Sequence, residues 1–303
     1  SLLAARLITQ IDKALNVKLT LRDLFESPTV AQLAQSLESG NRRSVLDVML
    51  PLQPHGTQTP LFCLHPGGGL SWSYSGLIPY LGAQQPLYGI QARRLSTGLA
   101  PHSIVEMAKA YLAEIYKVQP QGPYSLLGWS FGCHLAHEVA TLLQKDQQQV
   151  KSLTFMDGYP LWSKYKNSVR TDKESLRAMF EALTGTIPQD ETQLSVSMLQ
   201  QQLTQAGHPL ADVGLDVFEH ILAEFRDAPG LLAAFVPGVY DGDVLFFKAA
   251  RLTEGDENYD PQLWSPYVTG KIVIHNVPST HDSMLSAEAL KTIGPVLKAW
   301  VAG

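Results

Sequence analysis

The pattern Gly128-x-Ser130-x-Gly132 places a serine between two glycines at the spacing of a nucleophile elbow. It follows the apolar run Tyr124–Leu127 and precedes an amphipathic stretch, so we expect a sharp turn between a strand and a helix. Glycines suit such a turn because side chains at the flanking positions would collide with the neighbouring strand and helix. An ordinary glycine-rich turn is the alternative. We predict that Ser130 is the nucleophile of an acyl-transfer reaction.

A serine nucleophile needs a base, and two histidines near the C-terminus are candidates. His275 lies inside or at the edge of the strand predicted over Ile272–Ile274, where a structural histidine is the more typical interpretation. His281 lies in the following loop, before a helix that begins near Met284. Loop position and chain order therefore favour His281 as the general base.

Two positions are candidates for the acid that orients the histidine. Asp157 directly follows the strand predicted over Ser152–Met156, so its side chain should emerge at the carboxyl edge of the sheet beside Ser130. The alternative is the charged loop after the strand predicted over Val244–Phe247, which we expect to be solvated. The carboxylates of that loop are Glu254, Asp256 and Glu257. Position favours Asp157.

Compact apolar runs alternate with amphipathic helical patterns from Pro60 onward, which is typical of an α/β fold with a mostly parallel sheet. The predicted strands are Leu61–Leu64, Leu87–Gln91, Tyr124–Leu127, Ser152–Met156, Val244–Phe247 and Ile272–Ile274. Amphipathic helices interrupt the alternation between about 163 and 236. We expect this insertion to form a lid over the site. Extra packing on the core is the alternative, because apolar stripes alone do not distinguish the two.

Residues 1–40 differ in kind from the remainder. They contain short amphipathic helices, the last of which is expected to begin at Ser27-Pro28 and to end at Gly40. So few residues bury too little apolar surface for an independent domain. The sequence also opens on Ser1 without a methionine, so we expect a piece of a longer protein. The polar, glycine- and proline-containing composition of residues 41–57, with one short apolar run, predicts a linker that ends in an edge strand.

The run LRDLFESPTVAQLAQSLE resembles the later helices of the acyl or peptidyl carrier domain of nonribosomal peptide synthetases. The resemblance implies that residues 1–40 are a partial carrier domain and that Ser1 bears a covalent 4′-phosphopantetheine. A helix start suits the resulting phosphate. A plain helix cap is the alternative for Ser1. The glycine pair and the first helix of that family are absent here.

The region from 58 to 303 resembles the thioesterase that terminates nonribosomal peptide synthetases. The resemblance rests on LFCLHPGGG, GWSFG, LTFMDGYP and PSTHDSML. It implies an α/β-hydrolase with a mostly parallel sheet and a helical lid over about 163–236, with its acid at Asp157. It also implies an oxyanion hole made by the backbone N–H groups of Gly67 and Phe131, against which an ordinary glycine loop is the alternative. We interpret His65 as structural. Cys133 departs from the family, where a further glycine is common.

Composition excludes several classes of function. The net charge of −5 does not favour a nucleic-acid partner. Two cysteines, Cys63 and Cys133, are too few for a disulfide framework or a zinc site, which fits a reducing compartment. There is no membrane-length apolar run and no signal-peptide pattern at the start. We therefore expect a cytoplasmic protein without a metal and without a membrane partner.

Together these features predict chain release by a terminal thioesterase. A peptidyl or acyl thioester on the adjacent carrier would be the substrate, and upstream condensation and adenylation domains would be partners in the same assembly. The acyl chain would pass to Ser130 and leave by hydrolysis or cyclisation. A free-acting esterase or editing thioesterase is one alternative. A catalytically inactive carrier-binding module is another, from a different class.

Overall fold

The computed structural model describes residues 10–11, 14–15, 30–38, 46–161, 170–186, 194–206, 208, 210–211, 213–252 and 257–303. The chain divides into two compact units, Ser1–Ser44 and Val45–Gly303. In the first unit the structure describes the helix α3, Val30–Glu38, on which Leu33 is buried. The start expected for this helix at Ser27-Pro28, and Ser1 itself, lie outside the described residues.

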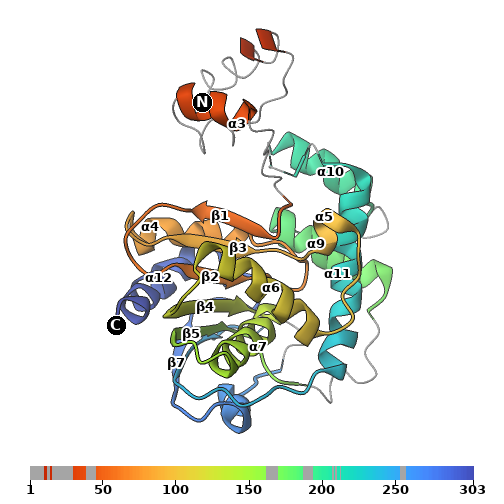
Figure 1. Ribbon diagram of the computed structural model, residues 1–303. Helices are drawn as coiled ribbons and strands as arrows, with labels where there is room; N and C mark the ends of the chain where they lie inside the picture. Colours follow the sequence, from red (N-terminus) through yellow and green to blue (C-terminus); the bar gives the residue numbers. More distant parts are fainter. Residues whose placement is uncertain are drawn as a thin grey trace. The chain divides into compact units, whose positions relative to one another are not determined.

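The second unit contains a seven-stranded sheet in the order β1-β3-β2-β4-β5-β6-β7 (Figure 1). Only β1 is antiparallel to its neighbour, and the other paired strands run parallel. The six strands predicted from the apolar runs are confirmed, and four of them extend further. The strands are β1 Met49–Gln53, β2 Leu61–Leu64, β3 Leu87–Ile90, β4 Tyr124–Trp129, β5 Val150–Met156, β6 Val244–Ala249 and β7 Ile272–Val277.

The edge strand expected in the linker segment 41–57 is confirmed as β1. Its Met49 is opposite Ile90 and its Pro51 opposite Tyr88 in β3. Proline is tolerated because an edge strand leaves half of its backbone N–H groups unpaired within the sheet. Leu50 of this strand is fully buried, so the short apolar run contributes to the core. The boundary between the two units accordingly falls after Ser44, upstream of this strand.

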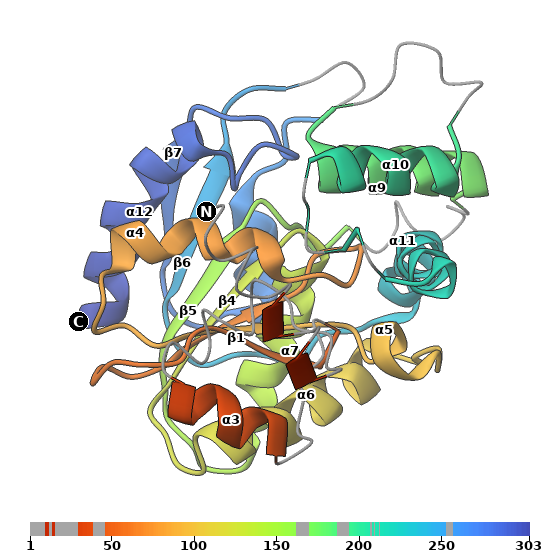
Figure 2. The same cartoon turned by 90° about the horizontal axis from the view of Figure 1, so that it is seen from above.

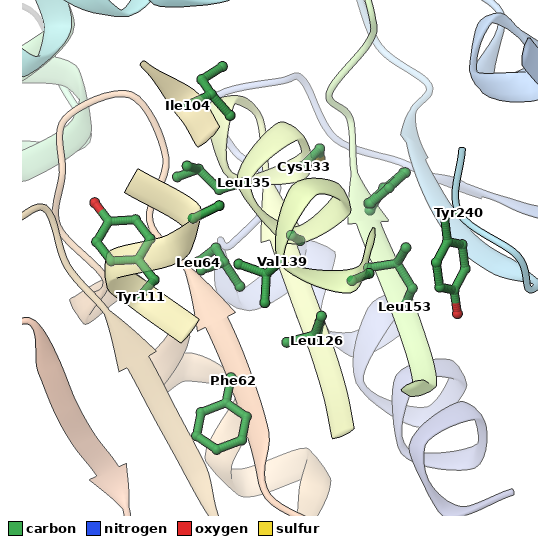
Figure 3. Close-up of a cluster of buried hydrophobic side chains, with 14 of the residues drawn as sticks. Phe62, Leu64, Ile104, Tyr111, Leu126, Cys133, Leu135, Val139, Leu153 and Tyr240 are labelled. Atoms are coloured by element: carbon green, nitrogen blue, oxygen red, sulfur yellow. The ribbon is translucent and has the colours of Figure 1, made fainter. Parts of the chain in front are cut away.

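Helices cover both faces of the sheet (Figures 1 and 2). On one face lie α6, Ile104–Val118, and α7, Phe131–Lys145. On the other lie η1, Trp72–Leu77, α4, Ile78–Leu81, and α12, Ala287–Ala302. Figure 3 shows strand side chains of the first face packed against Leu135 and Val139 of α7. A sheet buried on both faces explains why its strands appear as continuous apolar runs.

Three helices lie between β5 and β6: α9, Asp172–Thr184, α10, Val196–Gln205, and α11, Leu215–Ala234. They fall within the range expected for the lid, and Figure 2 shows them gathered together. They enclose an apolar cluster of their own that includes Phe180, Leu203 and Phe218. Leu95, on the short helix α5, Arg94–Thr97, anchors this cluster to the rest of the unit.

A buried ion pair lies at the junction of α5 and α11. Arg94 Nε is 3.2 Å from Glu224 Oε1, and Arg94 Nη2 donates a hydrogen bond of 2.7 Å to Asp227 Oδ2. Glu224 is almost fully buried, and this burial raises its pKa to about 7 although Arg94 acts in the opposite direction. The carboxyl group therefore titrates near neutral pH.

Candidate active site

Ser130 occupies a strained turn between β4 and α7. Its backbone lies at φ 55° and ψ −120°, in a region that residues other than glycine rarely occupy. The Ser130 N–H donates a hydrogen bond of 2.9 Å to the carbonyl of Met156 in β5, which holds the turn against the neighbouring strand. This turn projects the serine beyond the carboxyl end of the sheet.

The two glycines of the motif are needed for packing. A Cβ at Gly128 would overlap the carbonyl of Gly132, and a Cβ at Gly132 would overlap the carbonyl of Leu64 in β2. Backbone atoms cannot move away as a flexible side chain can, so even alanine would force strand and helix apart. The structure therefore contains the close contacts that the sequence predicted at the two glycines of the elbow.

Asp157, His281 and Ser130 form one continuous contact chain. Asp157 Oδ2 is 2.8 Å from His281 Nδ1, and His281 Nε2 is 3.0 Å from Ser130 Oγ. When Nδ1 carries the proton and donates it to the carboxylate, Nε2 is free to accept the proton of the serine hydroxyl. The three residues come from the ends of β4 and β5 and from the segment between β7 and α12. Folding brings together positions up to 151 residues apart.

The carboxylate of Asp157 is held at both of its oxygens. Oδ1 accepts hydrogen bonds from the backbone N–H of Ala249, at 2.9 Å, and from the hydroxyl of Tyr159, at 2.8 Å. Burial alone would raise the pKa of Asp157, but its bond to His281 and these two further bonds outweigh burial and hold the pKa below its ordinary value. The group is therefore ionised at neutral pH, as an orienting acid must be.

His275 and Glu257 are placed differently from His281 and Asp157. His275 is within β7, opposite Phe247, and its ring is 6.1 Å from the Phe247 ring. Glu254 and Asp256 lie outside the described residues. Glu257 lines the same cavity as Ser130, but the carboxylate in contact with His281 is that of Asp157. The arrangement thus matches the residues that chain order and strand position favour.

The loop after β2 brings a second backbone segment to the serine. Gly67 and Phe131 line the same cavity as Ser130 and His281. Within the described part of the chain, neither residue's N–H has a hydrogen-bond acceptor. Phe131 is the first residue of α7, where the helix itself offers no acceptor. Each residue therefore brings an unpaired backbone donor to the cavity of the serine, and the oxyanion hole stays a prediction.

His65 anchors this loop. Its Nε2 is 2.7 Å from the hydroxyl of Tyr111 on α6, and its Nδ1 is 2.8 Å from the carbonyl of Pro66. Burial lowers the pKa of His65 to about 4, so the imidazole is neutral at physiological pH. These contacts agree with the structural role expected for it.

The cavity in front of Ser130 has a volume of about 260 Å³. The lid helix α11 contributes Ala228, Pro229 and Leu232 to its wall. Three cationic residues, Arg170, Lys248 and Arg251, also line it. The insertion between β5 and β6 therefore shapes the space in which a substrate would react, in addition to packing on the core.

Both cysteines are free thiols in the interior. Cys63 lies in β2, and Cys133 lies on the first turn of α7, where its Sγ donates to the carbonyl of Gly128 at 3.2 Å. Burial raises the pKa of both thiols far above the ordinary value, so they remain protonated and unreactive. Within the described ranges, no group of three histidine, cysteine or carboxylate side chains could hold a metal ion.

Sequence reasoning missed the residues that support the site. Tyr74 of η1 donates to the carbonyl of Leu64 at 2.7 Å and accepts from the N–H of Trp129 at 3.0 Å, so it ties β2 to β4 beside the serine. No local pattern indicates this contact. The position of Tyr159 two residues after Asp157 offered a signal for its bond to the carboxylate.

A mostly parallel sheet with a serine on a strained strand–helix turn, and a histidine and an acid from later strand ends, defines an α/β-hydrolase. The chain belongs to the thioesterase domain family, whose model matches residues 59–297. Residues 1–37 match the model of a phosphopantetheine attachment site. No helix in the described part of the chain is long and apolar enough to cross a membrane.

Individual relatives agree with this assignment. The chain is 38% identical over 300 residues to a dimodular nonribosomal peptide synthase of Bacillus subtilis (strain 168), in an alignment that covers 98% of this chain and 13% of that protein. In a crystal structure of a four-domain nonribosomal peptide synthetase bound to AMP and glycine, the matching chain is 27% identical, with a TM-score of 0.72. The match covers 98% of this chain and 23% of that chain. The thioesterase domain that cyclises surfactin shares the fold, with a TM-score of 0.57 and 19% identity. The match covers 87% of this chain and 99% of that chain.

Proposed function

We propose that the chain is the releasing end of a nonribosomal peptide synthetase. Residues 1–40 would be part of a carrier domain, and the unit that follows would be the thioesterase, with its lid over about 163–236. The hydrogen-bonded chain from Asp157 through His281 to Ser130, in a lidded cavity, is the observation that carries the proposal. The chain spans 13% of the Bacillus subtilis relative, which is consistent with upstream condensation and adenylation domains as partners in the same assembly.

The first half-reaction transfers the acyl chain to the enzyme. A phosphopantetheine on Ser1 would supply the thiol that carries the acyl chain as a thioester. Ser130 Oγ attacks the thioester carbonyl carbon while His281 Nε2 takes the hydroxyl proton. The N–H groups of Gly67 and Phe131 donate to the oxygen that becomes negative. The carbon–sulfur bond then breaks, His281 gives its proton to the leaving sulfur, and an ester on Ser130 remains.

The second half-reaction releases the product. His281 takes a proton from water, or from a hydroxyl or amine of the chain itself, as that group attacks the ester carbonyl. The bond to Ser130 Oγ breaks, and His281 returns the proton to the serine. Water gives a free acid, and an internal nucleophile gives a lactone or lactam. Asp157 remains ionised throughout and stabilises the imidazolium form of His281.

Intact mass spectrometry of the parent assembly tests the nucleophile. Ser130→Ala should stop release and leave the acyl chain on the carrier, whereas Ser96→Ala, at an exposed position on α5, should release product like the wild type. A serine-reactive fluorophosphonate probe should label the wild type and not Ser130→Ala. Unimpaired turnover by Ser130→Ala would refute the nucleophile, and an unlabelled wild type would favour a carrier-binding module without activity.

The attachment residue needs a separate test. Loading with coenzyme A and a phosphopantetheinyl transferase should raise the mass of the wild-type assembly by one phosphopantetheine at this carrier, and Ser1→Ala should abolish that increase. Ser27→Ala, a serine in the same segment, should keep it. Undiminished release of product after removal of residues 1–40 would instead indicate an enzyme that acts on diffusible thioesters.

A further inference from the structure

Three cationic side chains converge on the cavity that contains Ser130. Arg170 lies two residues before the lid helix α9, Lys248 lies in β6, and Arg251 follows the end of that strand. The contact chain from Asp157 through His281 to Ser130 uses none of the three. Their presence in a cavity of about 260 Å³ therefore needs another explanation.

These cations have no ion-pair partner among the residues that the structure describes. Among the residues that the structure describes, no carboxylate oxygen lies within 4.0 Å of the charged nitrogens of Arg170, Lys248 or Arg251. The two carboxylates that line the same cavity are Asp157 and Glu257, and Asp157 is engaged by His281. By contrast, Arg94 beneath the lid has carboxylates of two residues within 3.2 Å.

Lys248 lines the cavity of Ser130 and is adjacent in sequence to a residue that holds the catalytic acid. It directly precedes Ala249, whose N–H holds the carboxylate of Asp157. Lys248 is partly buried, so an anion beside it would be less screened by water than on the open surface. Ammonium and guanidinium groups bind carboxylates through charge-assisted hydrogen bonds, which are stronger than bonds between neutral groups.

Resting on the proposed function, we propose that Arg170, Lys248 and Arg251 form a subsite for an acidic group of the acyl chain, so that the enzyme prefers a chain with a carboxylate near the thioester. The phosphodiester of a phosphopantetheine arm is a second possible anion. It stands at the opposite end of a long arm from the thioester, whereas the cations and Ser130 line one cavity of about 260 Å³, just below the usual range for ligand sites of roughly 300–1,000 Å³. Proximity therefore favours the acyl chain.

Matched thioesters test this assignment. Peptidyl pantetheine thioesters that differ only by glutamate against glutamine at one position, scanned along the peptide, should show one position at which glutamate raises kcat/KM about tenfold or more. Lys248→Met and Arg251→Gln should each reduce that preference toward unity. Lys271→Met, an exposed lysine at the opposite end of the sheet before β7, should retain it.

The outcomes separate this inference from the proposed function. Turnover of the glutamine peptides with no preference at any position would overturn the acidic subsite and leave the thioesterase intact. A preference for phosphopantetheine over pantetheine that is independent of the peptide and lost in Lys248→Met would overturn it in favour of the arm phosphate. No turnover of any thioester, with no fluorophosphonate labelling of the wild type, would refute the proposed function itself.

Discussion

The carboxyl end of the sheet and the lid use buried carboxylates in opposite ways. Asp157 is held by several hydrogen bonds, so its pKa lies below the ordinary value and the charge is maintained. Glu224 is more deeply buried, beside a single arginine, and its pKa rises to about 7. The backbone differs as well, since Ser130 and Asp157 both have positive φ values whereas the lid residues lie on regular helices.

This difference separates the two tasks of the domain. Reacting groups need positions fixed to fractions of an ångström, and the sheet provides them through strained turns, tight glycines and hydrogen bonds that saturate the acid. The lid needs only to enclose a space of suitable shape and charge, and helices around a separate apolar cluster achieve this. We therefore expect the sheet end to govern the rate of the chemistry and the lid to govern stability and substrate choice.

The largest effect should come from the acid at the sheet end. Asp157→Asn preserves the shape of the site but favours the wrong tautomer of His281, and it should lower kcat for a simple acyl thioester by about 10⁴-fold. Asp146→Asn, at the far end of α7, should keep wild-type kcat. A loss of less than tenfold in Asp157→Asn would show that the sheet end does not depend on a charged acid.

Removing a core side chain from the lid should destabilise without disabling the chemistry. Leu203 is 1% exposed in the apolar cluster of the lid, so Leu203→Ala should cost roughly 2–5 kcal/mol of unfolding free energy. Denaturant unfolding measures this cost, and fluorophosphonate labelling of Ser130 under native conditions should persist. Leu215→Ala, at a position 54% exposed, is the control and should change little. Loss of labelling without loss of stability would contradict the separation.

The pH dependence of stability should reveal Glu224. Its folded-state pKa lies above its ordinary value of 4.5, so its contribution to stability is fully present below pH 4.5 and is lost as the pH rises through about 7. The loss is roughly 3 kcal/mol. Glu224→Gln should therefore flatten the decline in Tm between pH 5 and pH 8, as measured by thermal melts. An identical slope in both proteins would refute the assignment.

Asp157, the acid at the sheet end, should change the pH dependence of stability in the opposite direction. Because the pKa of Asp157 is lowered on folding, its contribution is present above its ordinary pKa and is lost as the pH falls. Asp157→Asn should consequently weaken the decline in Tm on the acidic side and leave the slope between pH 5 and pH 8 in place. Melts of the two variants over one pH series separate the regions.

The smallest effect concerns a glycine of the lid, which is compared with one of the elbow. A Cβ at Gly230, on α11, meets nothing within 4 Å, so Gly230→Ala should stabilise the protein by about 0.5–1 kcal/mol. Gly132→Ala, in the elbow, should destabilise it because the added Cβ overlaps the Leu64 carbonyl. Equilibrium unfolding in denaturant measures both. Equal effects at the two positions would show that the elbow is no tighter than the lid.

Much of the fold was accessible from the sequence because its signals are local. Buried parallel strands are short apolar runs, and the elbow is a five-residue pattern on one such run. Ser130, His281 and Asp157 could be chosen because each directly follows a strand or lies in the loop after one. The edge strand expected in the segment 41–57 is confirmed as β1, but its antiparallel pairing with β3 could not be predicted, because it depends on a partner strand far along the chain.

The remainder depends on contacts between distant segments. In the sequence, Lys248 is an ordinary strand residue, and only the fold places it beside the cavity. Tyr74 lies in a short 3-10 helix, and only the fold brings its hydroxyl into hydrogen bonds with the backbones of two strands. The raised pKa of Glu224, on α11, follows mainly from the burial of this side chain, which its neighbours in sequence do not reveal. Such features have no short-range pattern, because the atoms that create them lie far apart along the chain.

The two buried thiols make the protein convenient for spectroscopy. Cys63 and Cys133 are fully buried, and both remain protonated, so maleimide dyes should not modify them in the folded state. In the chain without a phosphopantetheine thiol, a cysteine introduced on the exposed side of α10 could therefore carry a single fluorophore without removal of either native thiol. Movements of the lid during turnover would then be observable in an otherwise unaltered enzyme.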